Sequence, residues 1–285
     1  MIGLYPSERS FTAFKDAIAT WNGKSCKDSS LFLLNEALSP RKKTWREFYI
    51  PFDYVNEKAK VIILGVTPGI TQWTNAMQMA RQGILKGWSD EAVLKETKKY
   101  GAFSGAMRNP LVKILDTVGI NRILKLTSCA EIFKDDSLVH FTSCFTNPIF
   151  DHRWNSANGS EIKVKALFPF FNQSLKFGFF KELEQLADAY VVAIGDAKIV
   201  MDYAVNTGII DHERLITGIP HPSLQNPRVS YFIGKKTRSS FKETRTMSDG
   251  SVHKSSNNLD KVDEDKVHAI DAVNRILATE GGMFT

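Results

Sequence analysis

The chain has 285 residues, of which 43% are hydrophobic, and a formal net charge of +6. This composition supports a sizeable core and excludes a globally disordered chain, while the length fits one large or two small domains. The mild excess of basic residues is compatible with a nucleic-acid partner but does not require one.

The cysteines and the hydropathy pattern suggest where the protein acts. Cys26, Cys129 and Cys144 are scattered without a CxxC pair, which argues for a reducing compartment and against a zinc or iron–sulfur site built on cysteine. The first residues, MIGLYPSERS, lack a signal pattern, and no apolar run approaches membrane-spanning length. We therefore expect a cytoplasmic protein with no membrane partner.

The first predicted elements are helices. A helix is expected over residues 7–21, where an apolar stripe recurs at helix spacing: Phe11, Phe14, Ile18 and Trp21. A second short helix is expected over residues 29–38, because Pro40 disfavours its continuation.

The stretch KVIILGVTPGITQ, residues 60–72, combines an apolar run with turn residues. Val61 to Leu64 is too short for a helix and predicts a strand covered on both faces. Gly65, Pro68 and Gly69 then form a tight loop, and ligands of open α/β sheets bind at such strand ends. A nucleotide phosphate loop is excluded, because neither GxGxxG nor Gly-Lys-Ser/Thr is present.

Residues 71–100 are predicted to form two helices, with a break at Gly87 and a cap at Ser89. The segment is interpreted either as a helical insertion that decorates the fold or as a lid that shapes a pocket. A further helix is expected to begin at Asn109–Pro110, a suitable cap and first-turn pair.

The remaining elements alternate strands with helices. Strands are expected over residues 139–145, 190–194 and 215–217, with a helix after Gly195–Asp196 and a closing helix around Val267 to Leu277. The alternation predicts a single domain over residues 1–285, of the three-layer α/β/α class with a central, mostly parallel sheet.

A basic segment precedes the closing helix. Residues 228–254 contain seven Lys and Arg against two Asp and Glu, and Ser, Thr, Asn and Gly fill the gaps. Residues 234–258 are therefore predicted to be a flexible basic loop, either solvated or in contact with phosphates.

Two motifs carry a resemblance to a known family. GxxPG (Gly65, Pro68, Gly69) and HPS (His221, Pro222, Ser223) resemble the two signature motifs of the uracil-DNA glycosylase superfamily, and the likeness spans roughly residues 55–233. The stretch GAFSGAMRNPLVKILDTVG, residues 101–119, is similar to the thermostable bacterial branch. That branch carries a four-cysteine iron–sulfur cluster, which three cysteines cannot supply. The tail HPSLQNP is more similar to the single-strand-selective branch.

The resemblance implies hydrolysis of the N-glycosidic bond of a base flipped out of DNA, without metal or cofactor. His221 would stabilise the leaving base. Thr67 stands where active relatives carry the Asp or Asn that positions water, and a threonine hydroxyl orients water without acting as a base at neutral pH. The backbone amides of Val66 and Gly69 would hold the base or a phosphate. Phe103 would stack on the base, and its flanking glycines favour an exposed ring.

Ser143 stands where relatives carry the asparagine that reads the uracil edge, while Asn147 lies four residues further on. Serine makes one adaptable contact and leaves room, so the substrate is expected to be uracil or a larger modified pyrimidine. A hypermodified cytosine of phage DNA, and with it a defence role, is an alternative to DNA repair.

The expected partner is DNA, bound by a monomer. The residues expected to contact DNA are Ser223, Leu224, Gln225, Arg228, Lys235, Lys236 and Arg238. Two other readings stay open: a non-catalytic binder of DNA or of modified bases, and an unrelated α/β enzyme of nucleotide metabolism.

Overall fold

The computed structural model describes residues 7–27, 30–38, 43–157, 168–223, 226–241, 244–246, 252–254 and 258–282. The chain divides into two compact units. Unit 1 comprises Met1–Gly105 and Ile132–Leu215, and unit 2 comprises Ala106–Glu131 and Ile216–Thr285. Each unit is described by itself.

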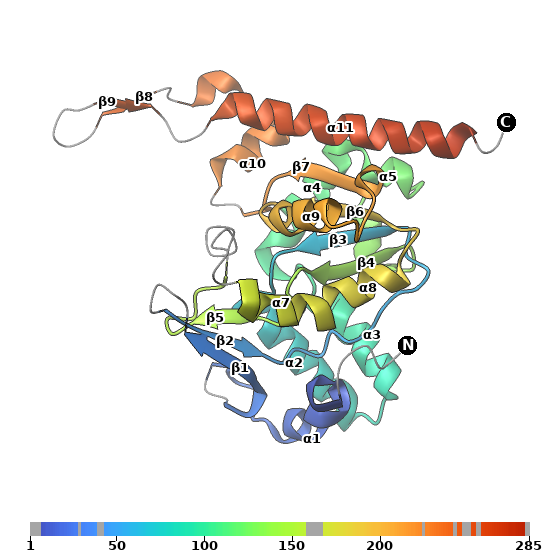
Figure 1. Cartoon of the computed structure of the whole chain (residues 1–285), viewed down its shortest axis with the longest axis vertical. Helices are drawn as coiled ribbons and strands as arrows, with labels where there is room; N and C mark the ends of the chain where they lie inside the picture. The colour runs from blue at the N-terminus through green and yellow to red at the C-terminus, as the bar shows by residue number, and fades with distance from the viewer. Residues whose placement is uncertain are drawn as a thin grey trace. The chain divides into compact units, whose positions relative to one another are not determined.

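Four strands form a parallel sheet flanked by helices, as the alternating pattern predicts (Figure 1). They are β3 (Val61–Gly65), β4 (Val139–Ser143), β6 (Tyr190–Ile194) and β7 (Leu215–Ile219), in the order β4-β3-β6-β7. The protein is therefore of the α/β class, with a helix-flanked sheet that fits a three-layer α/β/α arrangement.

Both faces of β3 are covered, which confirms the interpretation of its apolar run. All four residues from Val61 to Leu64 are fully buried. Ile62 and Leu64 belong to one core cluster with the helices that follow β5: α7 (Phe168–Phe177), α8 (Phe179–Gln185) and α9 (Ala197–Asn206). Strand β3, which leads into the glycine loop, is therefore held in the hydrophobic core.

A second, antiparallel sheet corrects one sequence prediction. The sequence predicts a helix over residues 29–38, but the described residues 30–38 form a short 3-10 helix, η2 (Ser30–Phe32), and then strand β1 (Leu33–Leu38). Strand β1 pairs with β2 (Thr44–Phe48), which pairs with β5 (Ile149–Asp151). The backbone hydrogen bonds supplied by β2 outweigh the local helical spacing of the leucines.

The segment predicted as an insertion or lid is helical and belongs to a core of unit 1. Helix α2 (Ile70–Leu85) and α3 (Asp90–Gly101) are separated at Gly87, and the Ser89 hydroxyl accepts from the Ala92 N–H, as predicted. Trp73 and Met77 of α2 are fully buried in a cluster with α1 (Phe11–Thr20) and β2. The two helices are therefore part of the packed interior of unit 1.

Unit 2 is built on a long C-terminal helix, α11 (Leu259–Gly282), which packs against α4 (Arg108–Val118), α5 (Ile120–Ile123) and α10 (Pro227–Phe232) (Figure 1). Helix α4 begins at Arg108 after Met107, so the prediction that Asn109 caps it is wrong by two residues. Gly218 is essential to this packing, because a Cβ there would lie 2.1 Å from the Asp265 backbone oxygen.

The basic segment contains regular structure within its described residues. A 3-10 helix, η7 (Arg238–Ser240), is followed by β8 (Thr244–Thr246) and β9 (Val252–Lys254), which pair antiparallel. The described residues also include four short 3-10 helices: η1 (Ser7–Arg9), η3 (Gly105–Met107), η4 (Glu131–Phe133) and η6 (His212–Arg214). No helix in the described part of the chain is both long and apolar enough to cross a membrane.

Candidate functional site

Two predicted site residues, Phe103 and Ser143, meet Gly65 of the GxxPG motif where β3 and β4 end. Gly65 and Ser143 are paired across the two parallel strands, and Phe103 comes from the turn after α3. A Cβ at Gly65 would lie 3.4 Å from both the Phe103 Cζ and the Ser143 Oγ. The aromatic ring and the serine hydroxyl therefore both lie close to the strand end at Gly65.

Phe103 has a strained backbone, with φ at +48°, in the left-handed region that non-glycine residues rarely adopt. Its side chain is only 7% exposed, so the expectation of an exposed ring is wrong. The ring packs against Phe141, with 6.1 Å between the ring centroids. Backbone strain of this kind is maintained by surrounding packing and is concentrated at functional sites.

The loop after β3 connects this strand end to helix α2. Gly69 has extended backbone angles and directly precedes α2, and Val66 is half-buried against the core. The Thr67 hydroxyl donates to the Asn147 carbonyl at 3.2 Å and accepts from the Ile149 N–H at 3.3 Å. Thr67 therefore links two loops of unit 1 and keeps one lone pair for another donor.

The Asn147 side chain is held inside unit 1. Its Oδ1 accepts from the Ile50 N–H at 3.2 Å, and its Nδ2 donates to Glu47 at 3.3 Å. The same Glu47 oxygen accepts from Arg9 at 2.6 Å and from Ser174 at 2.8 Å. A contact of the Asn147 amide with a base would require these bonds to break, so Ser143 is the better-placed polar side chain.

The histidine motif belongs to unit 2. His221 is exposed, Pro222 is buried, and the Ser223 N–H donates to the His221 carbonyl at 2.8 Å. Asn226 then caps α10 by accepting from the Arg228 N–H at 3.1 Å. Leu224 and Gln225 lie outside the described residues. Since the GxxPG loop lies in unit 1, its adjacency to the histidine loop stays a prediction.

The basic residues of unit 2 fall into two groups. The Arg238 guanidinium lies 2.7 Å from Asp260 and 2.6 Å from Asp263, and these bonds raise its pKa. The Arg238 guanidinium is thus already paired with two carboxylates of α11, with which a phosphate would have to compete. By contrast, no ion pair within the described residues involves the lysine cluster, which we define as Lys113, Lys235 and Lys236.

Lys113 of α4 was not anticipated from the sequence. Proximity to the Lys235 ammonium group lowers the pKa of Lys113, because the two like charges repel each other. The neighbouring Lys236 Nζ lies 5.7 Å from the centre of the Phe241 ring. Only the packing of α4 against α10 brings Lys113 to this cluster, so no sequence spacing indicates it.

A buried charged cluster lies in the core of unit 1 and was also missed. Lys98 of α3 lies 3.3 Å from Glu182 of α8, and donates to the Tyr54 carbonyl at 2.7 Å. His140 of β4 lies 3.2 Å from the second Glu182 oxygen. Lys98, His140 and Glu182 are at most 4% exposed, which leaves no access for a ligand.

The pKa values of this cluster follow from burial and pairing. Burial alone would raise the pKa of Glu182, but the stronger opposite effect of Lys98 and His140 lowers it from 4.5 to about 2. Burial lowers the pKa of His140, and Lys98 lowers it again. The His140 Nδ1 accepts from the Asn56 N–H, so the neutral ring carries its proton on Nε2 and donates it to Glu182. The cluster therefore holds α3, β4 and α8 together.

The described residues form neither a metal-binding site nor a reactive thiol site. No group of three or more His, Cys, Asp or Glu in these ranges is arranged to hold a metal ion. The three cysteines are buried and form no disulfide, and burial raises the pKa of Cys26 to about 12. These thiols are therefore protonated and inert at neutral pH.

Comparison with known proteins adds one relative. No protein-family model matches the chain, and no solved structure matches it. A protein of Bacillus subtilis (strain 168), described as the uncharacterized protein YoxB, is 28% identical over 184 residues, which cover 63% of this chain and 71% of that protein. The fold and the strand-end geometry therefore define this chain as an α/β protein with a candidate site after β3 and β4.

Proposed function

We propose that this protein is a DNA glycosylase of the uracil-DNA glycosylase superfamily, which hydrolyses the N-glycosidic bond of a pyrimidine flipped out of DNA. The observation that carries the proposal is the meeting of Gly65, Phe103 and Ser143 at one strand end. They come from three separate stretches of the sequence, and the resemblance implies that Phe103 and Ser143 line one base pocket with Val66, Thr67 and His221.

In the proposed reaction, the bond between the sugar C1′ and the base nitrogen breaks, and a water oxygen bonds to C1′. The base leaves with the electron pair and takes up a proton. Phe103 would stack on the extruded base, Ser143 would contact its polar edge, and His221 would stabilise the negative charge on its carbonyl oxygen. Thr67 and the backbone amides of Val66 and Gly69 would position the water or the base.

The substrate is proposed to be uracil or a modified pyrimidine. Ser143 offers one hydroxyl where an asparagine would offer a paired donor and acceptor, so a uracil edge would lose a contact worth about 1–3 kcal/mol. This loss corresponds to roughly tenfold to a hundredfold slower excision of uracil. A larger base, such as a hypermodified cytosine, would use the room that serine leaves.

A second candidate, a non-catalytic binder of DNA or modified bases, is favoured by one observation. The Thr67 hydroxyl already donates to the Asn147 carbonyl and accepts from the Ile149 N–H. A hydroxyl engaged in this way holds the loop in place and is a poor director of a nucleophilic water. Such a protein would keep the base pocket without turnover.

The decisive experiment measures single-turnover cleavage of oligonucleotides that each contain one altered pyrimidine, in duplex and single-stranded form. Wild-type protein should cleave a modified pyrimidine faster than uracil, and Ser143→Asn should raise the rate on uracil roughly tenfold or more. The matched control is Ser137→Asn, the same change at an exposed serine outside the site.

Each outcome separates the candidates. Binding of a modified-base oligonucleotide without cleavage of any substrate would favour the binder. Fast cleavage of uracil by wild-type protein, with no gain from Ser143→Asn, would leave plain uracil repair and remove the modified-base idea. Neither binding nor cleavage would reject both candidates.

A further inference from the structure

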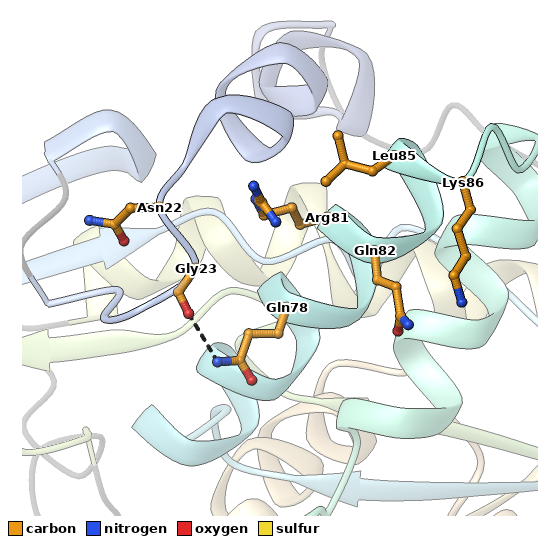
Figure 2. A pocket seen from close by; sticks show the side chains of 7 residues that line it. All are labelled: Asn22, Gly23, Gln78, Arg81, Gln82, Leu85 and Lys86. Atoms are coloured by element: carbon orange, nitrogen blue, oxygen red, sulfur yellow. Dashed lines mark hydrogen bonds between the residues drawn. The ribbon is translucent and has the colours of Figure 1, made fainter.

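A pocket of about 450 Å³ lies in unit 1, between the loop after α1 and the C-terminal half of α2 (Figure 2). None of the predicted site residues lines it. Its polar side chains come from Asn22, Gln78, Arg81, Gln82 and Lys86, and no Asp or Glu is among its lining residues. The volume is in the range of pockets that hold small organic molecules.

The acceptors of the loop are already used. The Gly23 carbonyl accepts from the Gln78 Nε2 at 3.1 Å, as Figure 2 shows. The Asn22 Oδ1 accepts from the Lys24 N–H at 2.9 Å. What these two residues leave for a ligand is the Asn22 amide NH₂, which is a donor.

Arg81 is held in position by the same loop. Its Nε donates to the Trp21 carbonyl at 2.7 Å, and Figure 2 shows its guanidinium directed from α2 toward the loop that carries Asn22 and Gly23. One edge of the planar group is thereby fixed, and the remaining N–H groups have no carboxylate partner within the described ranges. A guanidinium fixed in this way loses little freedom when it binds an anion.

Lys86 supplies a second positive charge at the end of α2. Its ammonium group lies 5.7 Å from the centre of the Trp88 ring, and no ion pair in the described part of the chain involves it. The pocket thus presents two cations and no carboxylate, together with the side-chain amides of Asn22, Gln78 and Gln82.

We propose that this pocket binds a small molecule through a carboxylate or phosphate group, with Arg81 as the principal contact and Lys86 as the second. An anionic oxygen accepts from the guanidinium edge in a charge-assisted hydrogen bond, whereas a cationic ligand would meet two like charges and no carboxylate. The pocket volume exceeds that of a lone anion, so the rest of the ligand occupies the space beside Gln78 and Gln82. This site is independent of the proposed glycosylase activity.

The test is a titration of full-length protein with inorganic phosphate, glycerol 3-phosphate or malonate at constant ionic strength. Intrinsic fluorescence is a direct reporter, since Trp21 and Trp88 adjoin the two cations. Saturable binding is expected for at least one probe, and the preference between the phosphates and malonate identifies the anionic group. Arg81→Gln should weaken that binding roughly tenfold or more, and Lys86→Gln by a smaller factor.

Two further variants keep the inference falsifiable. Arg153→Gln removes an exposed arginine elsewhere in unit 1 and should leave binding unchanged. If Arg81→Gln fails to fold, Arg81→Lys keeps the charge but loses the planar fork, and should bind the anion more weakly than wild type does. Absence of saturable binding by wild-type protein, or equal affinity in the Arg81 and Arg153 variants, would overturn the proposal.

Discussion

Asp53→Asn removes one buried titratable group while keeping its hydrogen bonds. Asp53 is 5% exposed, and a single oxygen, Oδ2, accepts from the Phe11 N–H at 2.7 Å and from the Tyr49 hydroxyl at 2.8 Å. An asparagine with its carbonyl oxygen at the same point accepts both. The substitution therefore changes the charge at this position and little else.

The size of the expected change in stability follows from the pKa of the Asp53 carboxyl group. Burial raises the pKa of Asp53 from 3.8 to about 7, against the lowering effect of the bonds from Tyr49 and Phe11. Between these values the folded protein holds a proton that the unfolded chain has lost, so stability falls as pH rises from about 4 to about 7. This difference in pKa between the folded and unfolded states lowers the free energy of unfolding by up to roughly 4 kcal/mol at neutral pH.

The assay is urea unfolding followed by tryptophan fluorescence at a series of pH values. All five tryptophans lie in unit 1, as does Asp53, so the signal reports the unit that carries the change. The free energy of unfolding of Asp53→Asn relative to wild type should rise as pH increases from about 4 to 7.

The control is Asp151→Asn, which should behave in the opposite way. Burial raises the pKa of Asp151, but bonds from Asn155, Lys43 and Arg153 lower it to about 2, so its stabilisation is present above 3.8 and lost at lower pH. Relative to wild type this variant should be less stable at neutral pH, by an amount constant above pH of about 4. A flat difference for Asp53→Asn across the same window would refute a protonated Asp53.

Three further perturbations test unit 2. Gly218→Ala should destabilise it by about 2 kcal/mol or more, because the new Cβ would meet the Asp265 backbone oxygen at a φ of +82°; unchanged hydrogen exchange in α11 would contradict this. His221→Ala should slow single-turnover cleavage on the order of a hundredfold with DNA affinity kept, and an unaltered rate would remove His221 from the mechanism. Neutralising the lysine cluster should flatten the salt dependence of DNA affinity by roughly 0.9 per lost contact, whereas Arg238→Gln, whose guanidinium is bound to Asp260 and Asp263, should leave it unchanged. Equal slopes in both variants would exclude the cluster from phosphate contact.

Elements with a strong local signal were predicted well. The strand at Val61, the two helices after Gly69 and the strand at Tyr190 all occur where the apolar pattern indicated them. Each is defined by residues close in sequence: an apolar run, a cap at Ser89 or a break at Gly87. Strand β1 was missed because its pairing with β2 is a non-local interaction that leucine spacing does not report.

For the candidate site, the sequence suggested which residues lie close together but not how buried they are or what they hydrogen-bond. The resemblance predicted a pocket bounded by Val66, Thr67, Phe103, Ser143 and His221. The register of β3 with β4 places Ser143 beside Gly65, and the Phe103 ring lies against the same strand end. The burial of Phe103 and the engagement of Asn147 by Glu47 could not be foreseen, because they depend on partners about 40 to 100 residues away.

The sequence by itself determined the α/β class, the positions of the glycine loops and the excess of basic residues near Lys235, since periodicity, turn chemistry and charge are properties of neighbouring residues. Only the tertiary structure decided which charges are available. It placed Lys98 and Asp53 in the core, bound Arg238 to α11, and left Lys113 and Arg81 without a carboxylate among the described residues. The reason is physical: an ionisable side chain acquires its pKa and its free hydrogen-bonding capacity from the solvent and partners around it, and packing alone determines both.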